Sequence, residues 1–161
     1  MNHQELLNLA LEIQNNQNPS EVKVRNAMGR LYYFAYHETL LMIQGNDGLK
    51  AVYDQLSGGS HEKVLKTFIE YYRLSQNYDA FEFGQKLEFL RNSRNIADYK
   101  LDRTLAITNF NTMLTQLKKL KELSNITKNQ FFQMKIRTVI HTQPNRNTTN
   151  QKPSKLRVVE D

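Results

Sequence analysis

The amino-acid sequence predicts an all-α fold, an up-and-down bundle of four to five helices followed by a disordered basic C-terminal tail. Apolar side chains recur at spacings of three and four residues along most of residues 1–123, as on the buried face of an amphipathic helix. Alternating runs rich in Val, Ile and Thr, which would indicate strands, are scarce. The chain has 161 residues, 39% of them hydrophobic, which suits a single domain with one core.

The first two helices are predicted from apolar spacing and from the breakers around them. Residues 4–13 place their leucines on one side of a short helix, which ends in a run of Asn and Gln. The second helix is expected to run from about Pro19 to Gln44, because proline suits a first helical turn and Asn18 can cap it. A glycine-containing turn then ends this helix, which forms the spine of the domain.

Two further helices follow a flexible breaker. A short helical pattern at 49–56 precedes the sequence Ser-Gly-Gly-Ser, and Ser60 is expected to cap a third helix that reaches about Arg73. A fourth helix begins after Asn77 and runs into a polar segment that ends near residue 99. Its Gly84 would cost about 1 kcal/mol relative to alanine at an exposed position.

The fifth helix carries the most regular apolar pattern in the chain. We expect it to begin after Asp102, which suits an N-cap. Its buried positions are predicted to be Ala106, Phe110, Met113, Leu117 and Leu120. Because this pattern lasts only about two heptads, it favours a bundle core over a free coiled coil. The bundle is therefore assigned to residues 1–123, and residues 124–140 are interpreted as a further short helix or a segment that binds a partner.

Positive charge is concentrated at the C-terminal end. The formal net charge is +6, yet residues 1–123 hold 15 basic and 14 acidic side chains, whereas residues 124–161 hold seven and two. Residues 141–161 are mostly Thr, Asn, Gln, Pro and basic residues, so we expect a disordered tail. Such a tail is either a solvated charged end or an arm that binds nucleic-acid phosphates. The basic residues predicted to bind are Arg137, Arg146, Lys152, Lys155 and Arg157.

Composition excludes several classes of function. A chain without cysteine has no disulfide, no thiolate metal site and no cysteine nucleophile. The sequence holds no glycine-rich phosphate loop and no closely spaced histidines, so we expect neither a cofactor nor a metal ion. Its first 17 residues lack the basic start and apolar run of a signal peptide, and no stretch reaches the roughly 20 apolar residues that span a bilayer. We expect a cytoplasmic protein that does not enter a membrane.

The segment EFLRNSRNIADYKL, residues 88–101, is the most unusual part of the chain. Arg91, Arg94 and Asp98 lie three and four residues apart, so their side chains share one face of a helix. One interpretation is structural, with Arg94 and Asp98 forming an ion pair worth about 0.3–0.5 kcal/mol and Tyr99 packed beside it. The other interpretation is a functional site.

This segment and two earlier ones resemble the HEPN superfamily over roughly residues 20–123. The second predicted helix, RNAMGRLYYFAYHETLLMI, is followed by SHEKVLKTF and then by LEFLRNSRNIADYKL, which is the order found in the family. The resemblance implies a bundle of four or five helices that is commonly a homodimer. It also implies, as in many members, a metal-independent ribonuclease of a toxin, antiviral or RNA-processing system. An antitoxin or a nucleotidyltransferase is the partner that such a protein would have.

The resemblance also implies a site. The family's catalytic pattern is an arginine, usually a polar neighbour, and a histidine four to six residues further, with two protomers supplying copies to one cleft. Arg94 and Asn95 match the first two positions, and Tyr99 stands where the histidine would be. The implied catalytic set is Arg94, Asn95, Asp98 and Tyr99, with Arg91 in support. A tyrosine, with a pKa of about 10, is a poorer base than a histidine near 6.5, so cleavage with Tyr99 or Asp98 in the proton-transfer role would be slow.

Two other positions contain candidate titrating groups. His61 begins the third predicted helix beside a glycine pair, where it is either a proton-transfer group or a plain residue of the capping turn. Arg30 and His37 match the arginine and histidine spacing literally, but their apolar neighbours favour a packing role. Two functions stay open: an RNA-cleaving homodimer, and a non-catalytic module that binds nucleic acid or a partner protein.

Overall fold

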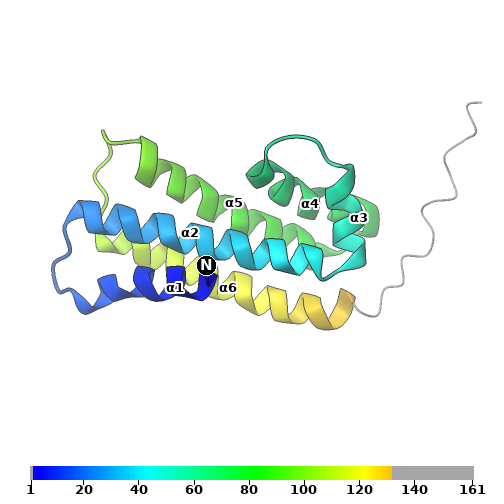
Figure 1. The fold of residues 1–161 in the computed structure, drawn as a ribbon, viewed down its shortest axis with the longest axis horizontal. Helices are drawn as coiled ribbons and strands as arrows, with labels where there is room; N and C mark the ends of the chain where they lie inside the picture. Colours follow the sequence, from blue (N-terminus) through cyan, green and yellow to red (C-terminus); the bar gives the residue numbers. More distant parts are fainter. Residues whose placement is uncertain (1, 132–161) are drawn as a thin grey trace, which may run out of the picture.

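The structure, a computed structural model, describes residues 2–131, which form six α-helices and one 3-10 helix and contain no strand (Figure 1). In chain order the elements are α1 (His3–Leu11), the 3-10 helix η1 (Glu12–Asn15), α2 (Glu21–Gln44), α3 (Asp47–Gln55), α4 (Ser60–Ser75), α5 (Tyr78–Tyr99) and α6 (Ile107–Phe131). The predicted all-α class is confirmed. Among these described helices, none combines the length and the apolar character needed to cross a membrane.

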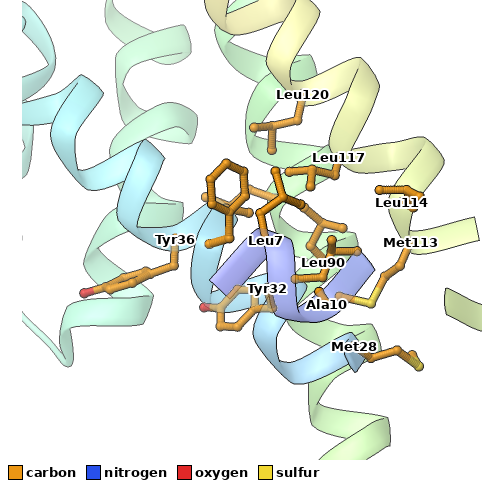
Figure 2. Packing of buried hydrophobic residues seen from close by; sticks show 14 of the residues in the cluster. Leu7, Ala10, Met28, Tyr32, Tyr36, Leu90, Met113, Leu114, Leu117 and Leu120 are labelled. Atoms are coloured by element: carbon orange, nitrogen blue, oxygen red, sulfur yellow. The ribbon is translucent and has the colours of Figure 1, made fainter. Parts of the chain in front are cut away.

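Helix α2 is the centre of the bundle and packs against α1, α5 and α6 (Figure 1). Helices α3 and α4 pack on each other near one end of the molecule, and α4 also lies against α5. In the core, leucines of α6 face Leu7 and Ala10 of α1 and Leu90 of α5 (Figure 2). The largest side chains buried almost completely include Phe34, Phe68, Phe83, Phe110, Leu31 and Leu117.

Two helices begin without the caps that the sequence predicts. Helix α2 begins at Glu21 after Ser20, so Asn18 lies too early to cap its first turn. Ser60 is itself the first residue of α4, and Gly59 precedes it without a side chain that could accept a hydrogen bond. In both cases the residue before the helix has the extended backbone that precedes a first helical turn. The two cap predictions are therefore wrong, although both helices exist where the apolar pattern predicts them.

Helix α6 begins at Ile107, five residues after the predicted cap Asp102. Asp102 and Ala106 are both exposed, so neither the predicted cap nor the predicted burial of Ala106 is correct. The turn at the helix start is instead built by Asn109, whose Oδ1 accepts the amide of Ala106 at 2.9 Å. Residues 100–106 form a connecting loop because contacts with α2, described below, hold them there.

Helix α6 continues without interruption to Phe131. Residues 124–131, the first part of the segment interpreted as a further short helix or a partner-binding segment, thus belong to the same helix as residues 107–123. The rest of that segment and the predicted tail at 141–161 lie outside the described residues. The same is true of the basic side chains from Arg137 to Arg157 that are predicted to bind phosphates.

Gly84 occupies a close approach between α4 and α5. It is buried, and a Cβ atom at this position would lie 3.2 Å from Cβ of Phe68 in α4. One residue earlier, the ring of Phe83 stacks on that of Phe68 with centroids 4.4 Å apart. The glycine therefore lets the two helices pack closely. The cost predicted for Gly84 assumed an exposed position, so it did not include this packing.

Candidate functional site

Three helices bring an arginine, a tyrosine and a histidine together. Arg94 of α5 donates a hydrogen bond of 2.9 Å from Nη2 to the hydroxyl of Tyr33 in α2. The Tyr33 ring meets the imidazole of His61, at the start of α4, edge to face with centroids 5.9 Å apart. We call Tyr33, His61, Arg94, Asp98 and Tyr99 the His61–Arg94 cluster.

Arg94 is held by contacts on several sides. Its Nε lies 2.6 Å from Oδ2 of Asp98, which confirms the predicted ion pair, although the angle at this buried Nε is not that of a hydrogen bond. Its Nη1 donates to Oδ1 of Asn95 at 3.2 Å. With its side chain only 17% exposed, the guanidinium has a restricted orientation and presents only part of its donor set to solvent.

Arg94 keeps its positive charge in this position. Burial lowers the pKa of the guanidinium, but the Asp98 carboxylate and the phenols of Tyr33 and Tyr99 outweigh burial and leave that pKa raised. The guanidinium also lies over two aromatic rings, with Cζ 5.3 Å from the Tyr33 centroid and 5.1 Å from the Tyr99 centroid. Cation–π attraction adds to the ion pair in fixing the position of this cation.

His61 lies among tyrosines at the other side of the cluster. Its Nδ1 is 2.8 Å from the hydroxyl of Tyr32, and its ring is 4.2 Å from that of Tyr36, centroid to centroid. The hydroxyl groups of Tyr32 and Tyr36 point away from the labelled leucines of α6 in the core (Figure 2). Tyr32 thus meets the histidine with its hydroxyl and Tyr36 meets it with its ring, and both side chains are buried.

Burial and neighbouring cations favour a neutral imidazole. Partial burial lowers the pKa of His61, and the charges of Arg94 and Arg91 lower that pKa further, with a smaller contribution from His37. Burial raises the pKa of Tyr32 to about 12, so its hydroxyl stays protonated near neutral pH. Their hydrogen bond therefore joins two neutral groups around pH 7.

The direction of the hydrogen bond between His61 and Tyr32 depends on which tautomer the imidazole adopts. If Nδ1 of His61 donates to the Tyr32 oxygen, Nε2 carries a free lone pair and is able to take up a proton. If the Tyr32 hydroxyl donates to Nδ1, Nε2 carries the hydrogen and is able to give it away. A neutral imidazole held at Nδ1 thus has the properties that general acid–base chemistry requires.

Arg25 caps the C-terminal end of α5, where Asp98 and Tyr99 lie. Its Nη1 donates to the carbonyl oxygens of Ala97 at 2.7 Å and Ile96 at 3.3 Å, and its Nη2 donates to the carbonyls of Lys100 and Arg103. The last carbonyls of a helix have no partner within the helix, so a guanidinium is a suitable cap for them. The Arg25 side chain is 12% exposed.

Glu21 completes this arrangement at the start of α2. Its carboxylate accepts from Nε of Arg25 at 2.9 Å and from the amide of Leu105 at 3.3 Å. These hydrogen bonds lower the pKa of the Glu21 carboxyl. The first turn of α2 thereby holds both the end of α5 and the loop that leads to α6.

The predicted site residues fall into two groups. Arg94, Asn95, Asp98 and Tyr99 lie together, and the charge of Arg91 is close enough to act on His61. Arg30, by contrast, is exposed on α2 and His37 is partly buried, while Leu31, Phe34 and Ala35 between them are buried. Sequence reasoning missed the parts played by Tyr33 and Arg25. The usable signal for the first was the run of tyrosines at 32, 33 and 36 in one helix.

Comparison with protein-family models, with curated proteins and with solved structures yields no significant match. Within residues 2–131, no group of three or more His, Asp or Glu side chains is placed to hold a metal ion.

Proposed function

We propose that this protein is an RNA-directed HEPN-type bundle that acts as a metal-independent endoribonuclease at the His61–Arg94 cluster. One observation carries the proposal: Tyr33 contacts both the largely buried guanidinium of Arg94 and the imidazole of His61. An arginine suited to a phosphate and a base suited to a hydroxyl proton are the two groups that RNA cleavage by its own 2′-hydroxyl needs. The sequence resemblance to the HEPN superfamily supports the same function.

This proposal gives the proton-transfer role to His61 in place of Tyr99 or Asp98. Asp98 is engaged by Arg94, and Tyr99 is a phenol, a poor base at neutral pH. His61 is the residue of the cluster whose ordinary pKa lies nearest to neutrality, and its lowered pKa keeps the imidazole unprotonated. The missing histidine after Arg94 is thus supplied by another helix.

The proposed reaction balances without a metal ion. Nε2 of His61 takes the proton of the ribose 2′-hydroxyl, whose oxygen attacks the neighbouring phosphorus. Arg94, assisted by Arg91, stabilises the charge on the non-bridging oxygens. The bond from phosphorus to the 5′-oxygen breaks, and that oxygen takes a proton from solvent. The products are a 2′,3′-cyclic phosphate and a 5′-hydroxyl.

Cleavage of labelled single-stranded RNA in EDTA tests the proposal. We expect His61→Gln and Arg94→Gln each to lower the rate by about 100-fold or more, the usual size of such contributions. His37→Gln is the matched control, because His37 also packs against Tyr36 but is not part of the His61–Arg94 cluster. Circular dichroism shows which variants are folded. Intact RNA with the wild type, or cleavage unaffected by His61→Gln, overturns the proposal.

A second function is favoured by the way Arg94 is engaged. Its hydrogen bond to Tyr33 joins α5 to α2, and its contacts with Asp98 and Asn95 of its own helix hold the guanidinium in place, as expected of a structural residue. We therefore keep as the alternative a non-catalytic module that binds nucleic acid or a partner such as a nucleotidyltransferase. RNA binding without cleavage, weakened by removal of residues 141–161, would select this alternative.

The resemblance further supports a homodimer of a toxin or antiviral system, with an antitoxin as another partner to test, and the cysteine-free sequence suits a reducing cytoplasm. Sedimentation of the purified chain measures the oligomeric state directly. Growth arrest on expression of the wild type, relieved by His61→Gln, would support the toxin role. A monomer that still cleaves RNA would remove the homodimer from the proposal while leaving the chemistry in place.

A further inference from the structure

Tyr99 offers an aromatic face to solvent at the edge of the His61–Arg94 cluster. It is the last residue of α5, and 67% of its surface is exposed. One side of its ring is occupied by the Arg94 guanidinium, with Cζ 5.1 Å from the ring centroid. That contact with a largely buried cation restricts the ring, so the remaining exposed surface is a fixed platform.

Basic residues lie before and after Tyr99 along the chain. Arg91 and Arg94 precede Tyr99 on the same helix, and Lys100 follows it directly. Lys100 is exposed, and Arg91 is partly exposed. Asp98 is paired with Arg94, so its charge is partly compensated within the cluster. A flat aromatic surface next to several cations suits a ligand that joins a planar ring to a phosphate.

We propose that Tyr99 stacks an unpaired nucleobase whose neighbouring phosphate is held by Arg94 and Arg91, which makes single-stranded RNA the preferred ligand of the cluster. The inference rests on the proposed RNA-directed function and specifies its substrate. In a duplex, base faces are covered by neighbouring bases, so a stacking platform selects strands whose bases are free. Because every base has a π face, little sequence preference is expected from this contact.

The stacking role differs from the proton-transfer role considered for Tyr99 in what it requires of the side chain. Stacking needs the ring, whereas the hydroxyl interacts with Arg94 within the cluster, so phenylalanine should largely replace tyrosine. Proton transfer needs the hydroxyl, so phenylalanine should fail. The exposed position at a helix end makes both Tyr99→Phe and Tyr99→Leu compatible with folding.

Binding to a 2′-O-methyl RNA, which lacks the attacking hydroxyl, separates affinity from cleavage. Fluorescence anisotropy with a labelled single strand and with its duplex gives the two affinities. We expect Tyr99→Leu to weaken single-strand binding roughly tenfold, within the range for loss of one stacked base. Tyr99→Phe should stay within about twofold of the wild type, and duplex binding should respond to neither change.

A 2-aminopurine placed in the single strand reports stacking directly, because its fluorescence changes when it stacks on an aromatic ring. The wild type and Tyr99→Phe should change this signal, whereas Tyr99→Leu should not. Leu101→Ala is the matched control, since Leu101 is also exposed near the same helix end but has no ring. An equal loss of affinity in Leu101→Ala would overturn stacking in favour of a general apolar contact.

Two further results would overturn the inference in distinguishable ways. If Tyr99→Leu binds single strands as the wild type does while Arg94→Gln does not, stacking is wrong and the RNA-directed function survives. If Tyr99→Phe loses affinity together with Tyr99→Leu, the hydroxyl carries the contact. Failure of the wild type to bind or cleave any RNA would instead refute the proposed function itself.

Discussion

The Nη2 atom of Arg94 donates a hydrogen bond of 2.9 Å to the hydroxyl of Tyr33, and this contact joins α5 to α2 across 61 residues of sequence. Tyr33 in turn packs against His61. The contact therefore couples the position of the arginine to that of the histidine, so a defect in Tyr33 should affect both the stability of the bundle and the geometry of the cluster.

Tyr33→Phe should lower the free energy of unfolding by about 1–2 kcal/mol, because a largely buried guanidinium loses a hydrogen-bond partner. Urea denaturation followed by circular dichroism measures the change. Tyr36→Phe is the control, since its ring also packs on His61 but no hydrogen bond of its hydroxyl is found among the described residues. Equal effects of the two substitutions would contradict a specific role for the Arg94 to Tyr33 hydrogen bond.

Arg25→Ala should destabilise the protein by roughly 2 kcal/mol and loosen the end of α5. The change leaves the carbonyls of Ile96 and Ala97 without this donor and leaves Glu21 without its ion-pair partner. Urea denaturation gives the stability, and hydrogen exchange of residues 96–106 reports the local effect. Lys23→Ala, an exposed change on the same helix, should cost less than about 0.5 kcal/mol. Unchanged exchange in this loop would show that Arg25 does not hold it.

Gly84→Val should destabilise the bundle by about 2 kcal/mol or more. The new Cβ would lie 3.2 Å from Cβ of Phe68, and the two further methyl groups would force α4 and α5 apart. Gln85→Val introduces the same side chain at an exposed position of α5, so it measures the cost of helix propensity alone. Thermal denaturation of both variants checks the prediction, which fails if the two melt together.

Local sequence patterns account for most of the fold and for part of the site. Residues such as Leu87, Leu90 and Phe110 are buried where a helical period places them, and Arg94 and Asp98 pair because four residues separate them on one helix. Helix starts are less predictable, since several residue types fit a cap. Asp102 has the right side chain, yet residues 100–106 form a loop held by Arg25 and Glu21.

The contacts between helices that form the site cannot be predicted from local sequence patterns. His61 reaches Arg94 only through Tyr33, and these three residues lie on three different helices. Their meeting depends on how α2, α4 and α5 cross, which no spacing within one helix determines. For the same reason, the residue spacing after Arg94 leads to Tyr99, whereas the nearby imidazole belongs to His61, earlier in the chain.

The stability of the protein should depend on pH through His61. The folded state lowers the pKa of this imidazole below its ordinary value near 6.5, chiefly by burial and then by the charges of Arg94 and Arg91. Below pH 6.5 the unfolded chain therefore takes up a proton at this position more readily than the folded one. The stability linked to the neutral His61 imidazole is fully present above pH 6.5, and it is lost as the pH falls through the pKa of the folded state.

We expect the free energy of unfolding to fall between pH 7.5 and pH 5.5 by more in the wild type than in His61→Gln, which has no group to titrate there. Glu21 and Glu62 also have lowered pKa values, but their effects begin below about pH 4.5 and are common to both proteins. Urea denaturation at the two pH values gives the comparison. A steeper fall in the variant would mean that protonation of His61 stabilises the folded state, and a neutral imidazole beside Arg94 would then be the wrong starting point for catalysis.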